Sequence, residues 1–183
     1  MNYSFKEFQR KSLHRLLGMD KYERIMQMMN DSKDLSTDKE FIKTFNAFYR
    51  VRRDKKWQDS FYKFFQENRN NKNLTFDEII DYMFDETGNV EASFCSKMLA
   101  TINPNMPIWD QYIIKNLKIK VEGNEKLERK ESVKKAYRDI INEMNERLKR
   151  DDVKIAIKEF REFFPNTYFS DMKILDYLTW NER

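Results

Sequence analysis

Apolar residues recur three and four positions apart along almost the whole chain, which is the spacing of one face of an α-helix. These apolar stripes predict helices around residues 5–17, 21–29, 41–49, 57–65, 79–84, 113–117, 125–150 and 155–164. Short segments beginning near residue 91 and after residue 170 bring the expected total to about ten helices. The pattern therefore predicts an all-α fold class.

Capping signals indicate where several of these helices begin or end. Thr37 with Glu40, and Thr75 with Glu78, match the capping box, in which a hydroxyl and a carboxylate each satisfy a free backbone N–H. Gly18 is predicted to end the first helix, because glycine readily takes the left-handed conformation of a helix C-cap. Other expected boundaries are a break at Gly123, a helix start at Asp151 and Asp152, a stop before Pro165 and a cap at Ser170.

Composition supports a packed helical body. Of 183 residues, 40% are hydrophobic, and 15 Phe, 9 Tyr and 3 Trp are too many for an unfolded chain. Only three Gly and three Pro are present, so tight turns are few and a multi-stranded sheet is not expected. The length fits a single domain over residues 1–183, or one body of two helical lobes around residues 87–117.

Several classes of protein and site are excluded by simple counts. No apolar run of about 18 residues could cross a membrane, so no membrane partner is expected, and the N-terminal residues lack the apolar core of a signal peptide. With one cysteine, Cys95, no internal disulfide can form, and together these points favour the cytoplasm. With one histidine, His14, a Cys/His zinc site is excluded, and we expect no metal and no cofactor.

The densest basic run lies between two predicted helices. From residue 50 to residue 72 there are eight Lys and Arg residues against three Asp and Glu residues. The cations that begin this run could neutralise nucleic-acid phosphates, while the neighbouring Tyr49, Trp57 and Tyr62 stack on bases. The alternative is a solvated connection whose aromatic side chains face the core. The run comprises Arg50, Arg52, Arg53, Lys55 and Lys56.

Residues 87–117 contain the densest backbone punctuation. Gly88 is predicted to end one helix, and a new helix begins within a few residues, so its free N–H groups could face an anion such as phosphate. Asn103 and Pro104 end that second helix. Asp110 then lies near the start of another helix, where it could serve as an N-cap, as a catalytic carboxylate, or as both.

This order of helix, glycine turn, helix, loop and aspartate resembles the helix-hairpin-helix DNA glycosylase superfamily. In that family the hairpin L-P-G-V-G grips backbone phosphate, and V-D-x-H-V-x-R supplies the catalytic Asp. Residues 110–115 read DQYIIK and follow that spacing, 22 residues after Gly88. The resemblance implies Asp110 as the catalytic residue, with Gly88, Asn89 and Lys115 contacting duplex DNA. Ala92 stands where bifunctional members carry a lysine, so the implied enzyme is a monofunctional glycosylase.

A second resemblance covers most of the chain. The stretches FYRVRRDKKWQDSFYKFF and EASFCSKMLATINPNMPIWD resemble a widespread bacterial protein family whose members are uncharacterised. This resemblance implies one intact domain and no particular chemistry. From the whole sequence we expect a nucleic-acid-binding protein related to base-excision DNA glycosylases. The alternative is a protein-interaction or structural domain on the same scaffold, without DNA binding or catalysis.

Overall fold

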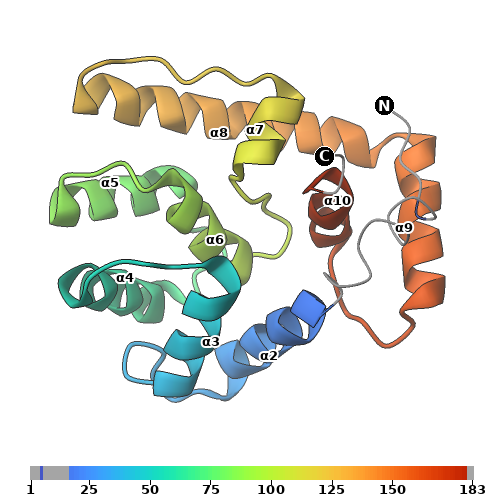
Figure 1. Cartoon of the computed structure of the whole chain (residues 1–183), viewed down its shortest axis with the longest axis horizontal. Helices are drawn as coiled ribbons and strands as arrows, with labels where there is room; N and C mark the ends of the chain where they lie inside the picture. Colours follow the sequence, from blue (N-terminus) through green and yellow to red (C-terminus); the bar gives the residue numbers. More distant parts are fainter. Residues whose placement is uncertain (1–4, 6–16, 181–183) are drawn as a thin grey trace. The chain divides into compact units, whose positions relative to one another are not determined.

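The computed structural model describes Phe5 and residues 17–180, and the regular secondary structure of these residues is entirely helical (Figure 1). The all-α fold class is therefore confirmed. Most of the predicted helix over residues 5–17 lies outside the described residues. His14 also lies outside them. In chain order the helices are α2 (Leu17–Asp31), α3 (Lys39–Tyr49), α4 (Lys55–Asn68), α5 (Phe76–Thr87), α6 (Ala92–Ile102), α7 (Gln111–Leu117), α8 (Lys126–Leu148), α9 (Asp151–Phe163) and α10 (Asp171–Trp180).

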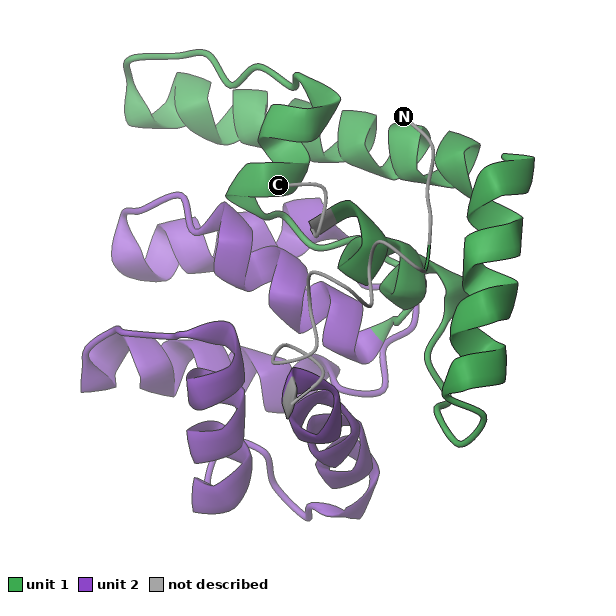
Figure 2. Ribbon diagram, turned by 45° about the vertical axis from the view of Figure 1, so that its right-hand side comes forward, with its two compact units in different colours: residues 1–13, 103–183 green, residues 14–102 purple. Residues whose placement is uncertain are grey.

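The chain forms two compact units (Figure 2). Unit 2 is the stretch His14–Ile102 and holds α2 to α6, whereas unit 1 combines Met1–Leu13 with Asn103–Arg183 and holds α7 to α10. The junction between them falls inside the segment 87–117 that the sequence singled out.

Unit 2 is built around an aromatic core. Phe41 and Phe45 of α3 meet Phe61 and Phe65 of α4, and all four side chains are fully buried. Their rings approach edge to face or tilted, with centroids 5.5 to 5.9 Å apart, which suits the ring quadrupoles. Helices adjacent in sequence pack on one another: α2 on α3, α4 on α5, and α5 on α6. The helical spacing of the Phe residues thus encodes the core of this unit.

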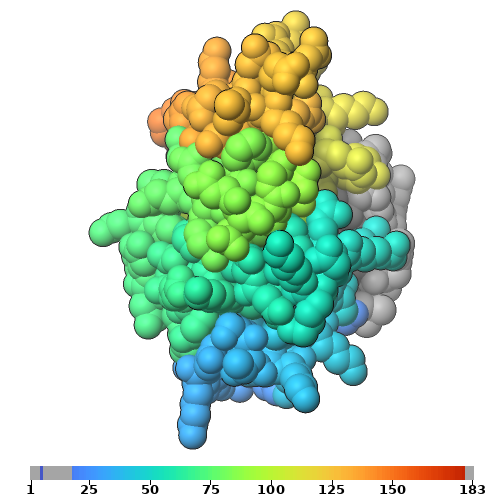
Figure 3. All heavy atoms as spheres, turned by 90° about the vertical axis from the view of Figure 1, so that its left-hand side faces the viewer, coloured from blue at the N-terminus to red at the C-terminus, as the bar shows by residue number. Residues whose placement is uncertain are grey.

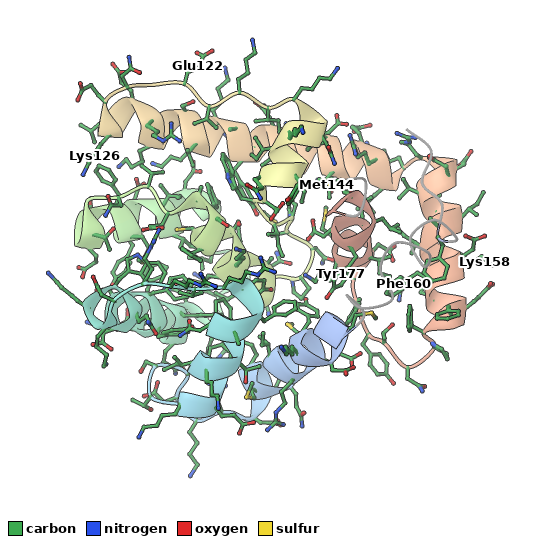
Figure 4. The ribbon with its side chains drawn as sticks, viewed as in Figure 1. Glu122, Lys126, Met144, Lys158, Phe160 and Tyr177 are labelled. Carbon is green, nitrogen blue, oxygen red and sulfur yellow. The ribbon has the colours of Figure 1, made fainter. Side chains whose placement is uncertain are left out.

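In unit 1 the long helix α8 and the C-terminal helix α10 share a core to which α7 and α9 contribute. Met144 of α8 and Phe160 of α9 are fully buried, while Lys158 of α9 points outward (Figure 4). Phe5 also belongs here, since its ring packs edge to face on Phe160 at 5.8 Å. Ile155, which we predicted to be on the apolar stripe of α9, is 59% exposed, because Val153 and Ala156 form the inner face of that helix instead.

Two predicted helix boundaries are wrong. The N-cap of α3 is Asp38, whose carboxylate accepts hydrogen bonds from the N–H groups of Glu40 and Phe41. Thr37 instead donates to the carbonyl of Asp34, and the Glu40 carboxylate pairs with Arg24, so no capping box forms there. A negative charge at the N-terminus of a helix is also favoured by the helix dipole.

Gly18 does not end a helix either. It is the second residue of α2, and an added Cβ would lie 3.4 Å from the ring of Phe48. Gly18 therefore lies close to the Phe48 ring of α3. Its φ is not positive, contrary to our expectation for a helix C-cap.

Other predicted boundaries are confirmed. Thr75 and Glu78 form both hydrogen bonds of a capping box at the start of α5, and the bonds from Thr75 lower the pKa of Glu78. Gly88 ends α5 with φ 67°. Ser170 accepts from the N–H of Lys173 at the start of α10.

Gly123 lies in the connection before α8, as predicted, with φ 101°. A Cβ at this position would come within 2.7 Å of the Arg129 backbone nitrogen. The connection runs back along α8 (Figure 4, Glu122), and the Glu122 N–H donates to the Ser132 hydroxyl at 2.8 Å. Only glycine allows the two backbones to approach so closely.

Candidate functional site

The basic segment, defined as Arg50, Arg52, Arg53, Lys55 and Lys56, joins α3 to α4 in unit 2, and all five side chains are exposed. Arg50 is the C-cap of α3 in the left-handed conformation, with φ 56°, and its N–H donates to the carbonyl of Asn46. Asp54 caps the start of α4 by accepting from the N–H of Trp57 at 2.8 Å. The connection is thus held at both ends by helix caps.

Two of the five cations have ion-pair partners. The Arg53 guanidinium contacts both carboxylate oxygens of Glu91, at 3.1 and 3.0 Å, and lies 5.2 Å above the ring of Phe94. Lys55 pairs with Asp59 one turn along α4. Among the described residues no ion pair is formed by the other three cations, Arg50, Arg52 and Lys56.

The aromatic residues beside the basic segment belong to the core. Tyr49, Trp57 and Tyr62 are only 7%, 6% and 1% exposed. Trp57 stacks on Phe61 with centroids 4.8 Å apart, and burial raises the pKa of the Tyr62 phenol. The core alternative is therefore confirmed for these rings, and they cannot stack on nucleic-acid bases without unpacking unit 2.

The turn between α5 and α6 begins at Gly88, whose N–H donates to the carbonyl of Phe84 at 2.7 Å. Asn89 follows Gly88 and makes two local hydrogen bonds. Its backbone N–H donates to the Thr87 hydroxyl, and its side-chain amide donates to the Thr87 carbonyl. Glu91, at the end of the turn, is the partner of Arg53, so the turn and the basic segment lie side by side at the surface (Figure 3, bright green and blue-green).

The charge around this turn opposes an anion. Helix α5 carries five Asp and Glu residues and no Lys or Arg, and Asp85 and Glu86 are exposed just before Gly88. Such negative charges raise the free energy of a phosphate at the turn. The basic segment, in contrast, gathers five exposed cations in seven residues of the chain.

Two other side chains near the turn have structural roles. The Lys97 ammonium donates to the Ser93 hydroxyl at 2.9 Å and lies 5.2 Å from the Phe94 ring centroid. Burial raises the pKa of the Cys95 thiol well above its usual value, so this cysteine is a small core residue, as predicted.

Asp110 lies in unit 1 and caps α7. Its backbone is extended, and its carboxylate accepts from the N–H of Tyr112 at 2.8 Å. The N-cap role is confirmed, and Asp110 as a whole residue is half-buried. Lys115 is exposed on the same short helix, and Lys118 and Lys120 are exposed just after it. The predicted site residues thus divide into two groups: Asp110 and Lys115 in unit 1, and the basic segment with Gly88 and Asn89 in unit 2.

The loop that leads to Asp110 is held by residues that sequence reasoning missed. The Tyr137 hydroxyl of α8 donates to the carbonyl of Pro107 at 2.6 Å. The Ser170 hydroxyl donates to the carbonyl of Pro104. Both contacts join residues at least 30 positions apart in the chain, so no local pattern could have shown them.

Asp176 of α10 is the second missed feature. Its side chain is enclosed in unit 1, and neither carboxyl oxygen makes a well-formed hydrogen bond to a described residue. Burial raises the pKa of Asp176 to about 7, against the stabilising effects of Lys173 and the Ile108 N–H, and the negative charge of Asp110 raises it further. An aspartate inside the apolar run ILDYL was the available sequence signal.

The described residues contain no group of three or more His, Cys, Asp and Glu side chains that could hold a metal ion. In the same part of the chain, every helix is too short or too polar to cross a membrane.

Comparisons with protein-family models, with curated proteins and with solved structures each found no match to this chain.

Proposed function

We propose that this protein binds nucleic acid through unit 2, with the basic segment contacting the phosphates of duplex DNA. The observation that carries this proposal is a set of three exposed cations, Arg50, Arg52 and Lys56, without ion-pair partners among the described residues. The caps at both ends of the connection and the Arg53–Glu91 contact hold its backbone in place. Less conformational freedom is then lost when phosphates bind.

The relation to DNA glycosylases is a further part of the proposal. Helix α5, the left-handed Gly88, helix α6 and an aspartate at the start of the next helix follow the order of the helix-hairpin-helix motif. In this proposal Asp110 occupies the position of the catalytic carboxylate, where it would stabilise a cationic sugar after the base has left the stack. Val90 and the acidic end of α5 are departures from that motif, so phosphate contact is assigned to the basic segment.

The test is fluorescence anisotropy with duplex DNA, intact and carrying an abasic-site analogue, over a range of salt concentration. Each neutralised phosphate contributes a slope of about −0.9 to the logarithm of affinity against the logarithm of salt, so three contacts predict a slope near −2.7. Charge reversal in Arg52→Glu with Lys56→Glu should flatten this slope and remove most of the binding. Unchanged binding in that double variant would disprove the role of the basic segment.

A control is Lys39→Glu, which reverses one charge, half the change of the double variant, on an exposed residue of the same unit. Lys39 is the first residue of α3, and Arg50 follows the last residue of that helix. Because α3 has 11 residues, these two positions are about 16 Å apart along the helix axis. A glutamate there suits the helix dipole, so the control should fold well and keep most of the affinity. A loss of binding free energy in the control half as large as that in the double variant would mean that only overall charge matters.

Catalysis is tested separately by release of a damaged base from duplex DNA. Asp110→Asn should abolish release while the fold survives, because asparagine is an equally good N-cap. Base release that persists in this variant would disprove the catalytic assignment of Asp110. A protein that neither binds DNA at low salt nor releases bases would leave the alternative, a protein-interaction domain, for which the adjacent acidic α5 and basic segment offer a mixed-charge surface.

A further inference from the structure

A cleft lies on unit 1 where the end of α8, one side of α9 and the start of α10 meet. Its volume is about 400 Å³, and it is lined by Leu148 of α8, Asp171 of α10 and five residues of α9. Sites for small molecules typically measure about 300 to 1,000 Å³. A stable protein interface, in contrast, buries about 800 Å² on each partner. The size of the cleft therefore suits a small molecule.

The floor of the cleft is apolar. Ile157 of α9 lies between Lys154 and Lys158 at spacings of three and one, so all three residues line the same side of the helix. The Ile157 side chain is 7% exposed, and Leu148 at the end of α8 is half-buried beside it. An apolar group placed in the cleft would therefore cover apolar surface of both helices, which the hydrophobic effect favours.

Two lysines with weak internal partners form one edge of the cleft. Lys154 and Lys158 are 60% and 78% exposed, and Lys158 points outward from α9 (Figure 4). Their ammonium groups lie 3.4 Å from an Asp151 oxygen and 3.8 Å from a Glu162 oxygen. Well-formed contacts of this kind measure about 2.7 to 2.9 Å, and exposed pairs contribute little free energy. Both ammonium groups can therefore turn to a ligand at low cost.

The opposite edge is held together by its own contacts. The Arg161 guanidinium donates to an Asp171 carboxylate oxygen at 2.6 Å and to the carbonyl of Phe169 at 3.0 Å. These two contacts join α9 to the start of α10 across ten residues of the chain. Arg161 and Asp171 therefore shape the cleft, and their charges offset each other.

The charges that line the cleft select the class of ligand. Three cations, Lys154, Lys158 and Arg161, stand against two carboxylates, so the lining has a net charge of +1. A cation is disfavoured by this net charge. A polyanion such as nucleic acid would approach Glu162 and Asp171 as well as the lysines. A single negative charge on an apolar body matches both the net charge and the floor.

We propose that this cleft binds a small molecule that carries one carboxylate on an apolar body. The carboxylate lies between the ammonium groups of Lys154 and Lys158, whose positions on α9 are one turn, about 6 Å, apart along the axis. The apolar body covers Ile157 and Leu148. This site belongs to unit 1, and it is independent of the DNA binding proposed for unit 2.

The test is a titration of the full chain with octanoate, followed by NMR of the backbone amides. We expect saturable shifts at Leu148 and at residues 154–162. Acetate has the same charge without the apolar body and should bind at least about tenfold more weakly, because each buried methylene adds to affinity. Octylammonium has a similar apolar body with the opposite charge and should not shift these amides.

A pair of variants tests the lysines. Lys154→Gln with Lys158→Gln should weaken octanoate binding about tenfold, since each lost contact with an exposed cation is worth roughly a factor of three. The matched control is Lys120→Gln with Lys135→Gln, which removes the same two charges from exposed positions of unit 1 outside the cleft. Because salt screens distant charges, the control should stay within about twofold of the wild type.

Several results would overturn the proposal. Equal losses in the two double variants would mean that octanoate responds only to overall charge, and octylammonium binding as tight as that of octanoate would leave only apolar contact. Duplex DNA that shifts the cleft amides where octanoate does not would assign the cleft to nucleic acid. A failure of octanoate to bind leaves the proposed function untouched, because that function is measured with DNA and with variants of unit 2.

Discussion

The Arg53 guanidinium meets the Glu91 carboxylate in two parallel contacts, Nε to Oε1 at 3.1 Å and Nη2 to Oε2 at 3.0 Å, across 38 residues of sequence. Glu91 is 8% exposed and Arg53 is 43% exposed, so the carboxylate lies inside unit 2 and the guanidinium reaches in from the surface. The planar guanidinium suits this two-point contact. The ion pair fastens the basic segment to the turn between α5 and α6.

The first prediction concerns the stability supplied by this ion pair. Glu91→Gln should lower the free energy of unfolding by about 1 kcal/mol, since it removes a charge-assisted contact that solvent screens only in part. The matched control is Glu40→Gln, whose pair with Arg24 is exposed on both sides, at 62% and 46%. That control should change stability by less than about 0.5 kcal/mol. Urea unfolding of both variants measures the difference, and equal values would contradict the anchoring role of Glu91.

The second prediction uses backbone conformation. Lys118 is the C-cap of α7 in the left-handed region, with φ 55°, where a side chain raises the free energy of the folded state. Lys118→Gly should therefore raise the free energy of unfolding by about 0.5 kcal/mol, after allowing for the greater freedom of glycine in the unfolded chain. Gly88→Ala, at φ 67°, should lower it by about 1 kcal/mol. Thermal unfolding by circular dichroism checks both directions, and a gain in Gly88→Ala would show that the turn is not held as described.

The third prediction separates the two roles of Asp110. Asp110→Ala loses the cap on α7 and should lower the free energy of unfolding by about 1 kcal/mol, whereas Asp110→Asn should stay close to the wild type. Both variants lose the carboxylate. The difference in unfolding free energy between the two variants therefore measures the contribution of the cap alone. A loss of activity that is equal in both variants measures the contribution of the negative charge.

The fourth prediction is a pH dependence of stability that arises from Asp176. Its pKa is about 7 in the folded protein, raised from 3.8, so between these values the folded state binds more protons than the unfolded state. The free energy of unfolding should then fall as pH rises from about 4 to about 7 and stay lower above that range.

The matched variant for this effect is Asp176→Asn, which keeps the shape of the side chain and cannot ionise. Relative to the wild type it should gain about 4 kcal/mol at pH 8, and the gain should shrink toward zero near pH 4. Melting temperatures of both proteins at pH 5 and pH 8 give the comparison. A gain that is the same at both pH values would mean that Asp176 does not titrate in the folded protein.

Local patterns predicted most helices because the signals for them lie within a few residues of one another. The Phe spacing in α3 and α4, the capping box at Thr75 and the C-cap at Gly88 each depend on contacts less than one or two turns away. The error at Thr37 has a local cause too. Asp38 competes for the same free N–H groups, and the sequence does not rank two adjacent candidates for one cap.

The candidate site was less accessible from sequence because its electrostatics depend on long-range contacts. The sequence showed that five cations lie close together between two helices. It could not identify the partner of Arg53, because Glu91 is 38 residues away in the chain. The burial of Tyr49 and Trp57 follows from how α3 and α4 meet, so a pattern that also suits base stacking could not decide between the two roles.

By itself, the sequence determined the helical class, several helix ends, and Asp110 as a candidate helix cap. All of these follow from composition or from neighbours along the chain. Only the tertiary structure decided which cations of the basic segment are paired, which aromatic rings are buried, and that Asp176 is enclosed near Asp110. The physical reason is that burial and charge pairing depend on residues that folding brings together from distant parts of the chain.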